Sequence, residues 1–225
     1  MAPLQFGALM IPYQTIDAIG PLDILSSASK KLIAAFEEAD LPGMKGMTAK
    51  AIDIEFHHIN ETLEPVTLTA NVRLLPSTTC DTCPALDFLL VGGPDPLAYK
   101  LSPRFAEFIR QHVAEGKVLF TTCTGALAVA ASGVLDGKNA TVNHAFVEMA
   151  KKMAPVVKWQ KRQWVVDGNI WTAGGACAGM DMFASWVMTN YGMDIARFVF
   201  GALDFEPRDV EGALVLPRQH GVKSA

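Results

Sequence analysis

Short apolar runs and amphipathic stretches alternate along this chain, which is the pattern of buried strands followed by helices. Apolar runs with the length of single strands occur at residues 6–12, 51–59, 87–93 and 117–122. Helical patterns occur at residues 20–38, 102–116 and 144–154. Strand and helix units joined by short connections favour an α/β fold with a doubly wound, largely parallel sheet flanked by helices on both faces.

The remaining segments predict less regular elements. Further strands or hairpins are expected at residues 66–76, 138–143 and 157–175, the last with a turn at Asp167-Gly168. Two successive helices are expected at residues 177–192 and 193–203. Because no linker, repeat or low-complexity segment divides the chain, we expect a single domain over residues 1–225.

Composition and charge limit the classes of partner. The chain has 225 residues, of which 50% are hydrophobic, and a net charge of -4 that is spread without blocks of like charge. Such a surface offers no electrostatic footprint for nucleic acid or for an anionic membrane. No apolar run approaches the roughly 18 residues that cross a bilayer, and the first residues do not form a signal peptide. We therefore expect a cytoplasmic protein with a small-molecule substrate and neither a nucleic-acid nor a membrane partner.

Four cysteines carry the first candidate chemistry: Cys80, Cys83, Cys123 and Cys177. They are too few for a disulfide scaffold, and we expect them to be reduced in a cytosol. Cys80 and Cys83 have the spacing of a redox pair or of half a zinc site, but a second pair of ligands is missing. We therefore predict a structural role for this pair and no metal site.

The most informative stretch is the one in which the strand expected at residues 117–122 gives way to an alanine-rich helix. The reversal falls on Cys123, Thr124 and Gly125, with almost no loop between the two elements. A thiol at a helix N-terminus faces unpaired N–H groups and the positive end of the helix dipole, and both favour the thiolate. The N–H of Thr124 can also point toward an anion that forms on a substrate. The alternative interpretation is a small buried core cysteine.

Three turns are expected to meet at the carboxyl edge of the sheet, where ligands gather in such folds. They lie at residues 13–21, 91–96 and 121–125. The first carries Asp17, which would cap the following helix or lie in a solvated turn if it had no chemical role. If Asp17 instead faces the Cys123 thiolate in a dry pocket, burial and like charge raise its pKa, and the two groups share one proton.

Four stretches together resemble the ThiJ/PfpI superfamily and, within it, the isonitrile hydratases. They read IDAIGPLDIL, LLVGGPDP, TTCTGALAVAASGVLDGKNATVNHAF and VVDGNIWTAGGACAGMD, and the similarity extends from about residue 6 to about residue 207. The resemblance implies a class I glutamine amidotransferase-like fold with a cysteine nucleophile elbow, a homodimer, and no metal or organic cofactor. It also implies a lyase that hydrates an isonitrile to an N-substituted formamide.

The resemblance assigns roles to four residues. Cys123 occupies the position of the nucleophile, and Asp17 matches the acidic residue that hydrogen-bonds to the thiol. Thr124 matches the hydroxyl residue that follows the cysteine in hydratases, and it argues against peptidase chemistry. Gly93 would supply a backbone N–H near the reacting carbon.

Other positions differ from the family pattern or stay open. Val91 stands where a proline is usual, and Cys177 stands where hydratases more often carry a hydroxyl residue, so the substrate is not identified. Whether His144 or Cys177 lines the pocket is open as well. The tail at residues 206–225 can cover the site, join a dimer contact or be mobile.

Two other functions use the same thiol. A cofactor-independent glyoxalase would form a hemithioacetal between Cys123 and a 2-oxoaldehyde. A non-catalytic sensor would instead respond to oxidation of Cys123 to sulfenic or sulfinic acid. Some relatives are fused to a DNA-binding helix-turn-helix region, but the chain shows no basic recognition helix, so we do not expect a regulator of that kind.

Overall fold

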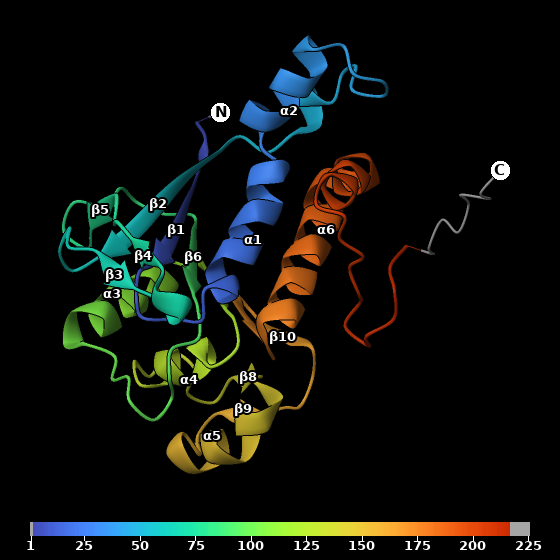
Figure 1. The fold of residues 1–225 in the computed structure, drawn as a ribbon. Helices are drawn as coiled ribbons and strands as arrows, with labels where there is room; N and C mark the ends of the chain where they lie inside the picture. The colour runs from blue at the N-terminus through green and yellow to red at the C-terminus, as the bar shows by residue number, and fades with distance from the viewer. Residues whose placement is uncertain (1, 217–225) are drawn as a thin grey trace.

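The computed structural model describes residues 2–216 (Figure 1). Its main sheet has seven strands in the order β10-β11-β7-β6-β1-β2-β5. The strands are β1 (Leu4–Leu9), β2 (Ile54–Asn60), β5 (Thr78–Thr79), β6 (Phe88–Val91), β7 (Val118–Thr121), β10 (Trp164–Asp167) and β11 (Ile170–Ala173). Every neighbouring pair is parallel except β10 and β11, which form an antiparallel hairpin. The predicted α/β fold with a largely parallel sheet is confirmed.

Helices cover both faces of this sheet. They are α1 (Ile16–Ser27), α2 (Lys30–Glu38), α3 (Pro103–Ala114), α4 (Gly125–Ala130), α5 (Val147–Met153) and α6 (Ala176–Ala202). The chain steps from β1 to β2 through α1 in one direction, and from β6 to β7 through α3 in the other. Because such crossovers are right-handed, α1 and α3 lie on opposite faces. The helix α6 runs beside α1 (Figure 1).

Short elements complete the described chain. Three 3-10 turns are η1 (Thr48–Lys50), η2 (Thr69–Asn71) and η3 (His144–Phe146). Two small ladders pair β3 (Val66–Thr67) with β4 (Arg73–Leu74), and β8 (Asn139–Ala140) with β9 (Lys158–Trp159). The hairpin expected at residues 66–76 is confirmed, whereas the strand expected at 138–143 is limited to the two residues of β8. No helix within residues 2–216 has the length and apolar character needed to span a membrane.

The single helix expected at residues 20–38 is wrong, because the chain forms α1 and α2 there. The backbone of Ser29 is extended, and its hydroxyl accepts a hydrogen bond from the N–H of Leu32, which caps α2. The same turn pairs with Ile52, which donates to the carbonyl of Ala28. A contact with a segment more than 20 residues away therefore ends the first helix.

The break predicted between residues 192 and 193 is confirmed inside α6. Gly192 has φ 81° and ψ 171°, a conformation outside the helical region that L side chains rarely adopt. The run Ala176–Ala202 is therefore two helical segments that meet at this glycine.

Aromatic side chains fix α6 over the central strands. The rings of Phe120 on β7 and Phe183 on α6 have centroids 4.5 Å apart, and Phe6 on β1 lies 6.0 Å from Phe183. All three are almost fully buried, and each contributes roughly 2 kcal/mol through its burial. This packing holds the start of α6 next to the carboxyl ends of β1 and β7.

Part of the C-terminal tail lies against α6. The N–H of Arg208 donates to Oδ1 of buried Asp181 at 2.9 Å, and Arg208 pairs with Leu214 across a short bridge. Burial raises the pKa of Asp181. The position of the tail was open from the sequence; residues 206–216 are anchored in this way, and residues 217–225 lie outside the described part.

Candidate active site

The chain reverses at Cys123, between β7 and α4, as the sequence predicts. Cys123 has φ 55°, a left-handed conformation that is uncommon for residues other than glycine and often marks functional sites. A Cβ atom on Gly125 would collide with the carbonyl oxygen of Val91, so the tight turn requires glycine at that position. The thiol is presented on a strained elbow and is buried.

Asp17 reaches this elbow from the first turn of α1. Its side chain is fully buried, and its Oδ2 accepts a hydrogen bond from the N–H of Gly93 at 3.0 Å. Its Oδ1 is buried without a hydrogen-bond partner among the described residues. Asp17 does not cap α1, whose N-cap is Thr15. The carboxyl group is therefore held through Oδ2, next to the side chain of Cys123.

Burial raises the pKa of Asp17 to about 6, although the N–H of Gly93 and the side chain of Cys123 lower it in part. Burial also raises the pKa of the Cys123 thiol, and the neighbouring charge of Asp17 raises it further. Hydrogen bonds from Asn143 and Thr124 lower it in part. The predicted preference of Cys123 for the thiolate is therefore wrong in direction, because burial and a facing carboxylate outweigh the end of the short helix α4.

Gly93 and Thr124 complete the surroundings of the thiol. The Thr124 hydroxyl donates to the carbonyl oxygen of Pro94 at 2.6 Å, and both groups are buried. A Cβ atom on Gly93 would lie 2.6 Å from the backbone nitrogen of Thr124 and 2.8 Å from Oδ2 of Asp17. Glycine is thus required for the close approach of the three segments. The N–H of Gly93 was expected to lie near the reacting carbon of a substrate. In the structure it donates to Oδ2 of Asp17 instead.

Asn143 is a contact that the sequence did not suggest. Its side-chain nitrogen lies 3.2 Å from Sγ of Cys123, and its backbone N–H donates to the Cys123 carbonyl. The sequence feature that could have indicated Asn143 was its position at the end of the stretch predicted as a strand, next to His144. The ring of His144 points elsewhere, with Nε2 2.8 Å from the carbonyl oxygen of Arg162. Cys177, on the first turn of α6, is exposed.

Tyr13 is a second residue that was missed. It lies fully buried between β1 and α1, and its hydroxyl donates to Sδ of Met10 at 3.6 Å. Burial and the charge of Asp17 raise the pKa of Tyr13 to about 12. The phenol therefore stays protonated at neutral pH.

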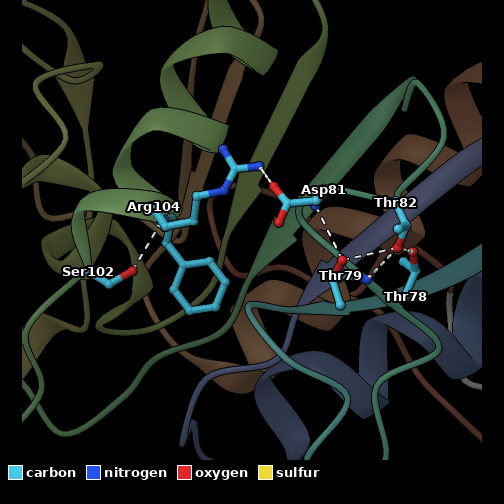
Figure 2. Close-up of polar contacts among 7 residues, drawn as sticks. Thr78, Thr79, Asp81, Thr82, Ser102 and Arg104 are labelled. Atoms are coloured by element: carbon cyan, nitrogen blue, oxygen red, sulfur yellow. Dashed lines mark hydrogen bonds and ion pairs between the residues drawn. The ribbon is translucent and has the colours of Figure 1, made fainter.

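Cys80 and Cys83 lie in a separate loop after β5, at the edge of the sheet and four strands from β7. Figure 2 shows the contacts that hold this loop: the hydroxyls of Thr79 and Thr82 lie 3.0 Å apart, and Asp81 forms an ion pair with Arg104 of α3. Burial raises the pKa of each thiol to about 11. The part of the chain that the structure describes has no group of three His, Cys, Asp or Glu side chains arranged to hold a metal ion.

The sequence profile of the DJ-1/PfpI family matches residues 12–189. The chain belongs to the DJ-1/PfpI family. Isonitrile hydratase of Pseudomonas putida is 31% identical over 206 residues, which cover 91% of this chain and 79% of that protein. The helix-turn-helix-type transcriptional regulator GbdR of Pseudomonas aeruginosa is 25% identical over 57% of this chain, but the match covers only 35% of the regulator.

Solved structures of DJ-1/PfpI proteins share the fold. A ThiJ/PfpI family protein from Pseudomonas syringae superimposes with a TM-score of 0.73 at 23% identity, over 93% of this chain and 78% of that one. DJ-1beta of Drosophila melanogaster superimposes with a TM-score of 0.69 at 17% identity, over 91% of this chain and 99% of that one. The family resemblance stated from the four sequence stretches is confirmed.

Proposed function

We propose that this DJ-1/PfpI protein is a cofactor-independent lyase that hydrates an isonitrile to the N-substituted formamide. The observation that carries the proposal is the buried pair of Cys123 and Asp17, in which a thiol on a strained elbow faces a carboxyl group whose pKa is raised to about 6. A general acid and base works best when its pKa lies near the working pH. The similarity to a curated isonitrile hydratase supports the same substrate class.

The first half of the proposed reaction joins the thiol to the substrate. Asp17 accepts the proton of the Cys123 thiol, and the thiolate attacks the terminal isonitrile carbon to form the S–C bond. Asp17 then delivers that proton to the same carbon, which accepts both a nucleophile and a proton. The product is a thioimidate on Cys123. The addition needs neither an oxidant nor a reductant.

The second half releases the formamide. A water molecule attacks the thioimidate carbon and gives a proton to the Asp17 carboxylate. The Thr124 hydroxyl donates to Pro94, so its oxygen is oriented to accept a hydrogen bond from that water. The C–S bond then breaks; one proton of the water ends on the substrate nitrogen and the other returns to the Cys123–Asp17 pair.

Oxygen-18 water tests this proposal. An aryl or alkyl isonitrile should yield a formamide that carries one heavy oxygen, because the carbonyl oxygen comes from the water that resolves the thioimidate. Cys123→Ala should abolish turnover, and Asp17→Asn should slow it strongly, since the amide keeps the size of the side chain but cannot exchange the proton. Cys83→Ala, in the separate loop, is the matched control and should keep its activity.

Methylglyoxal should be assayed beside the isonitriles. Conversion of methylglyoxal to lactate by a protein that leaves a panel of isonitriles unchanged would replace the hydratase with the glyoxalase. Selective oxidation of Cys123 without turnover of either substrate would instead indicate the sensor. Cys123 stays the reactive group in both of these outcomes. The assay therefore tests which reaction the protein catalyses and does not test the identity of the reactive residue.

We further infer a homodimer in the cytoplasm. Large apolar side chains remain on the surface of the described chain, with Leu75 69% and Leu97 78% exposed. Such side chains can be buried in a contact with another protein. The family resemblance favours a second copy of this chain as the partner.

A further inference from the structure

Two hydrogen bonds fix the orientation of the Asn143 side-chain amide, and a third holds its backbone. Its backbone N–H donates to the Cys123 carbonyl at 3.2 Å. Its Oδ1 accepts from the N–H of Ala145 at 3.0 Å, and its Nδ2 donates to Sγ of Cys123 at 3.2 Å. If the amide were rotated by half a turn, its NH₂ group would face the N–H of Ala145. The N–H of Ala145 therefore selects the orientation in which a donor faces the sulfur.

Besides Asn143, Thr124 hydrogen-bonds to the thiol, and the titratable groups around the thiol contribute little to these donors. Asp17 faces Cys123 from α1 and opposes a negative charge on sulfur. Tyr13 donates to a methionine sulfur, and the ring of His144 is hydrogen-bonded to the carbonyl of Arg162. The phenol of Tyr13 and the Nε2 atom of His144 are therefore engaged with partners other than Cys123. A buried thiolate needs donors in place of the water that it has lost.

We propose that Asn143 is a catalytic residue, whose amide donates a hydrogen bond to the Cys123 sulfur while that sulfur is a thiolate. It acts twice in a turnover: before sulfur attacks the substrate carbon, and again when the thiolate leaves. The place of Asn143 in turnover rests on the proposed hydration, but its effect on the thiol does not. Because an amide does not titrate, it stabilises the charge without competing with Asp17 for the proton.

The pH profile of Cys123 alkylation by iodoacetamide tests the role of Asn143 without any substrate. The rate is followed by peptide mass spectrometry, with exposed Cys177 as the internal reference. Asn143→Ser keeps the backbone N–H and a side-chain oxygen that can cap Ala145, but its side chain is too short to reach the sulfur. Loss of a hydrogen bond to a charged group should raise the midpoint of the Asn143→Ser profile by about one to two pH units relative to the wild type.

Asn143→Asp provides a second, nearly isosteric variant. It also keeps the cap, but it replaces the donor by a carboxylate and should raise the midpoint at least as far as Asn143→Ser does. Ser102→Ala removes the N-cap of α3, away from the elbow, and is the control for the loss of a cap. Its Cys123 profile should match that of the wild type.

An unchanged Cys123 profile in folded Asn143→Ser or Asn143→Asp would overturn the proposal, as would an equal shift in Ser102→Ala. The result is independent of the hydratase assay. A protein that leaves isonitriles unchanged, yet shows the shift, would disprove the proposed reaction and keep Asn143 as the donor to the thiolate. If hydration does occur, Asn143→Ser should lower kcat more than it raises KM, because the hydrogen bond strengthens as charge develops on sulfur.

Discussion

At the scale of single residues, Asp17 links the chemistry of the site to the stability of the fold. Its pKa is raised by burial from 3.8 to about 6, so the folded state binds this proton more tightly than the unfolded chain does. The contribution of Asp17 to stability is therefore fully present below its unfolded pKa and is lost as pH rises through its folded pKa. The shift corresponds to about 3 kcal/mol.

Asp17→Asn should accordingly stabilise the protein near neutral pH while it impairs turnover. At pH 7.5 we expect its free energy of unfolding in urea to exceed that of the wild type by up to about 3 kcal/mol, with the gap closing as pH falls toward 4. Burial also lowers the pKa of His58 and of His112. Both histidines are present in the wild type and in the variant, so their effects cancel when the two free energies of unfolding are compared. A gap that does not change with pH would contradict a raised pKa for Asp17.

The residues of the site differ in how far the sequence can identify them. Cys123 lies between residues typical of a buried strand and residues typical of a helix, with almost no loop between them. Its place on an elbow could therefore be predicted from its neighbours. Asn143 could not, because its contact with the sulfur depends on how the chain returns to the elbow 20 residues later. The direction of the Cys123 pKa was missed for a related reason: burial depends on the packing of several segments, and local sequence shows only the end of the helix.

At the scale of elements, the first turns of α6 pack behind both catalytic candidates. A Cβ atom on Gly179 would lie 2.5 Å from Cγ2 of Thr122, and one on Gly20 would lie 2.9 Å from the side chain of Met180. Thr122 precedes Cys123, and its hydroxyl donates to the carbonyl oxygen of Asp17 at 2.8 Å. The close approach of α6 therefore helps to set the position of α1 relative to the elbow.

Gly179→Ala should push Thr122 away from α6 and disturb this arrangement. We expect a loss of about 1 to 3 kcal/mol of stability, as in other overpacked cores, together with slower turnover. Adding Thr122→Ser should restore much of both, because it removes the Cγ2 methyl and keeps the hydroxyl that donates to Asp17. Urea denaturation and the isonitrile assay measure the two effects.

Gly201→Ala is the matched control in the same helix, since a Cβ atom there would meet nothing within 4 Å. It should be neutral or stabilise the protein by up to about 1 kcal/mol through helix propensity. Equal destabilisation by Gly179→Ala and Gly201→Ala would show that the contact with Thr122 has no effect.

The elements show the same division between local and distant causes. The break in α6 was predictable because Gly192 carries it within the helix itself. The break between α1 and α2 was not, because it depends partly on pairing of the chain near Ser29 with Ile52. The parallel pairing of the central strands followed from the alternation of strands and helices, whereas β5, which was not predicted, and the short length of β8 depend on neighbours that the local pattern does not identify.

At the scale of the whole molecule, the proposed homodimer has to overcome only a modest charge. Each chain carries a net charge of -4, and at physiological salt charges on two surfaces are screened beyond about 8 Å. Apolar surface, such as that of Leu75 and Leu97, is therefore the expected source of association. Whether the whole of residues 1–225 folds as one domain also stays a prediction at this scale.

Sedimentation equilibrium at micromolar concentration should give a mass of about twice the 24.2 kDa of the chain. Because burial of apolar surface is not screened by salt, the mass should be the same in dilute buffer and at roughly 0.5 M sodium chloride. A complex that dissociates as salt is added would point to ionic contacts instead of an apolar interface. A monomer under all of these conditions would reject the dimer, while the Cys123–Asp17 pair, which lies within one chain, would be unaffected.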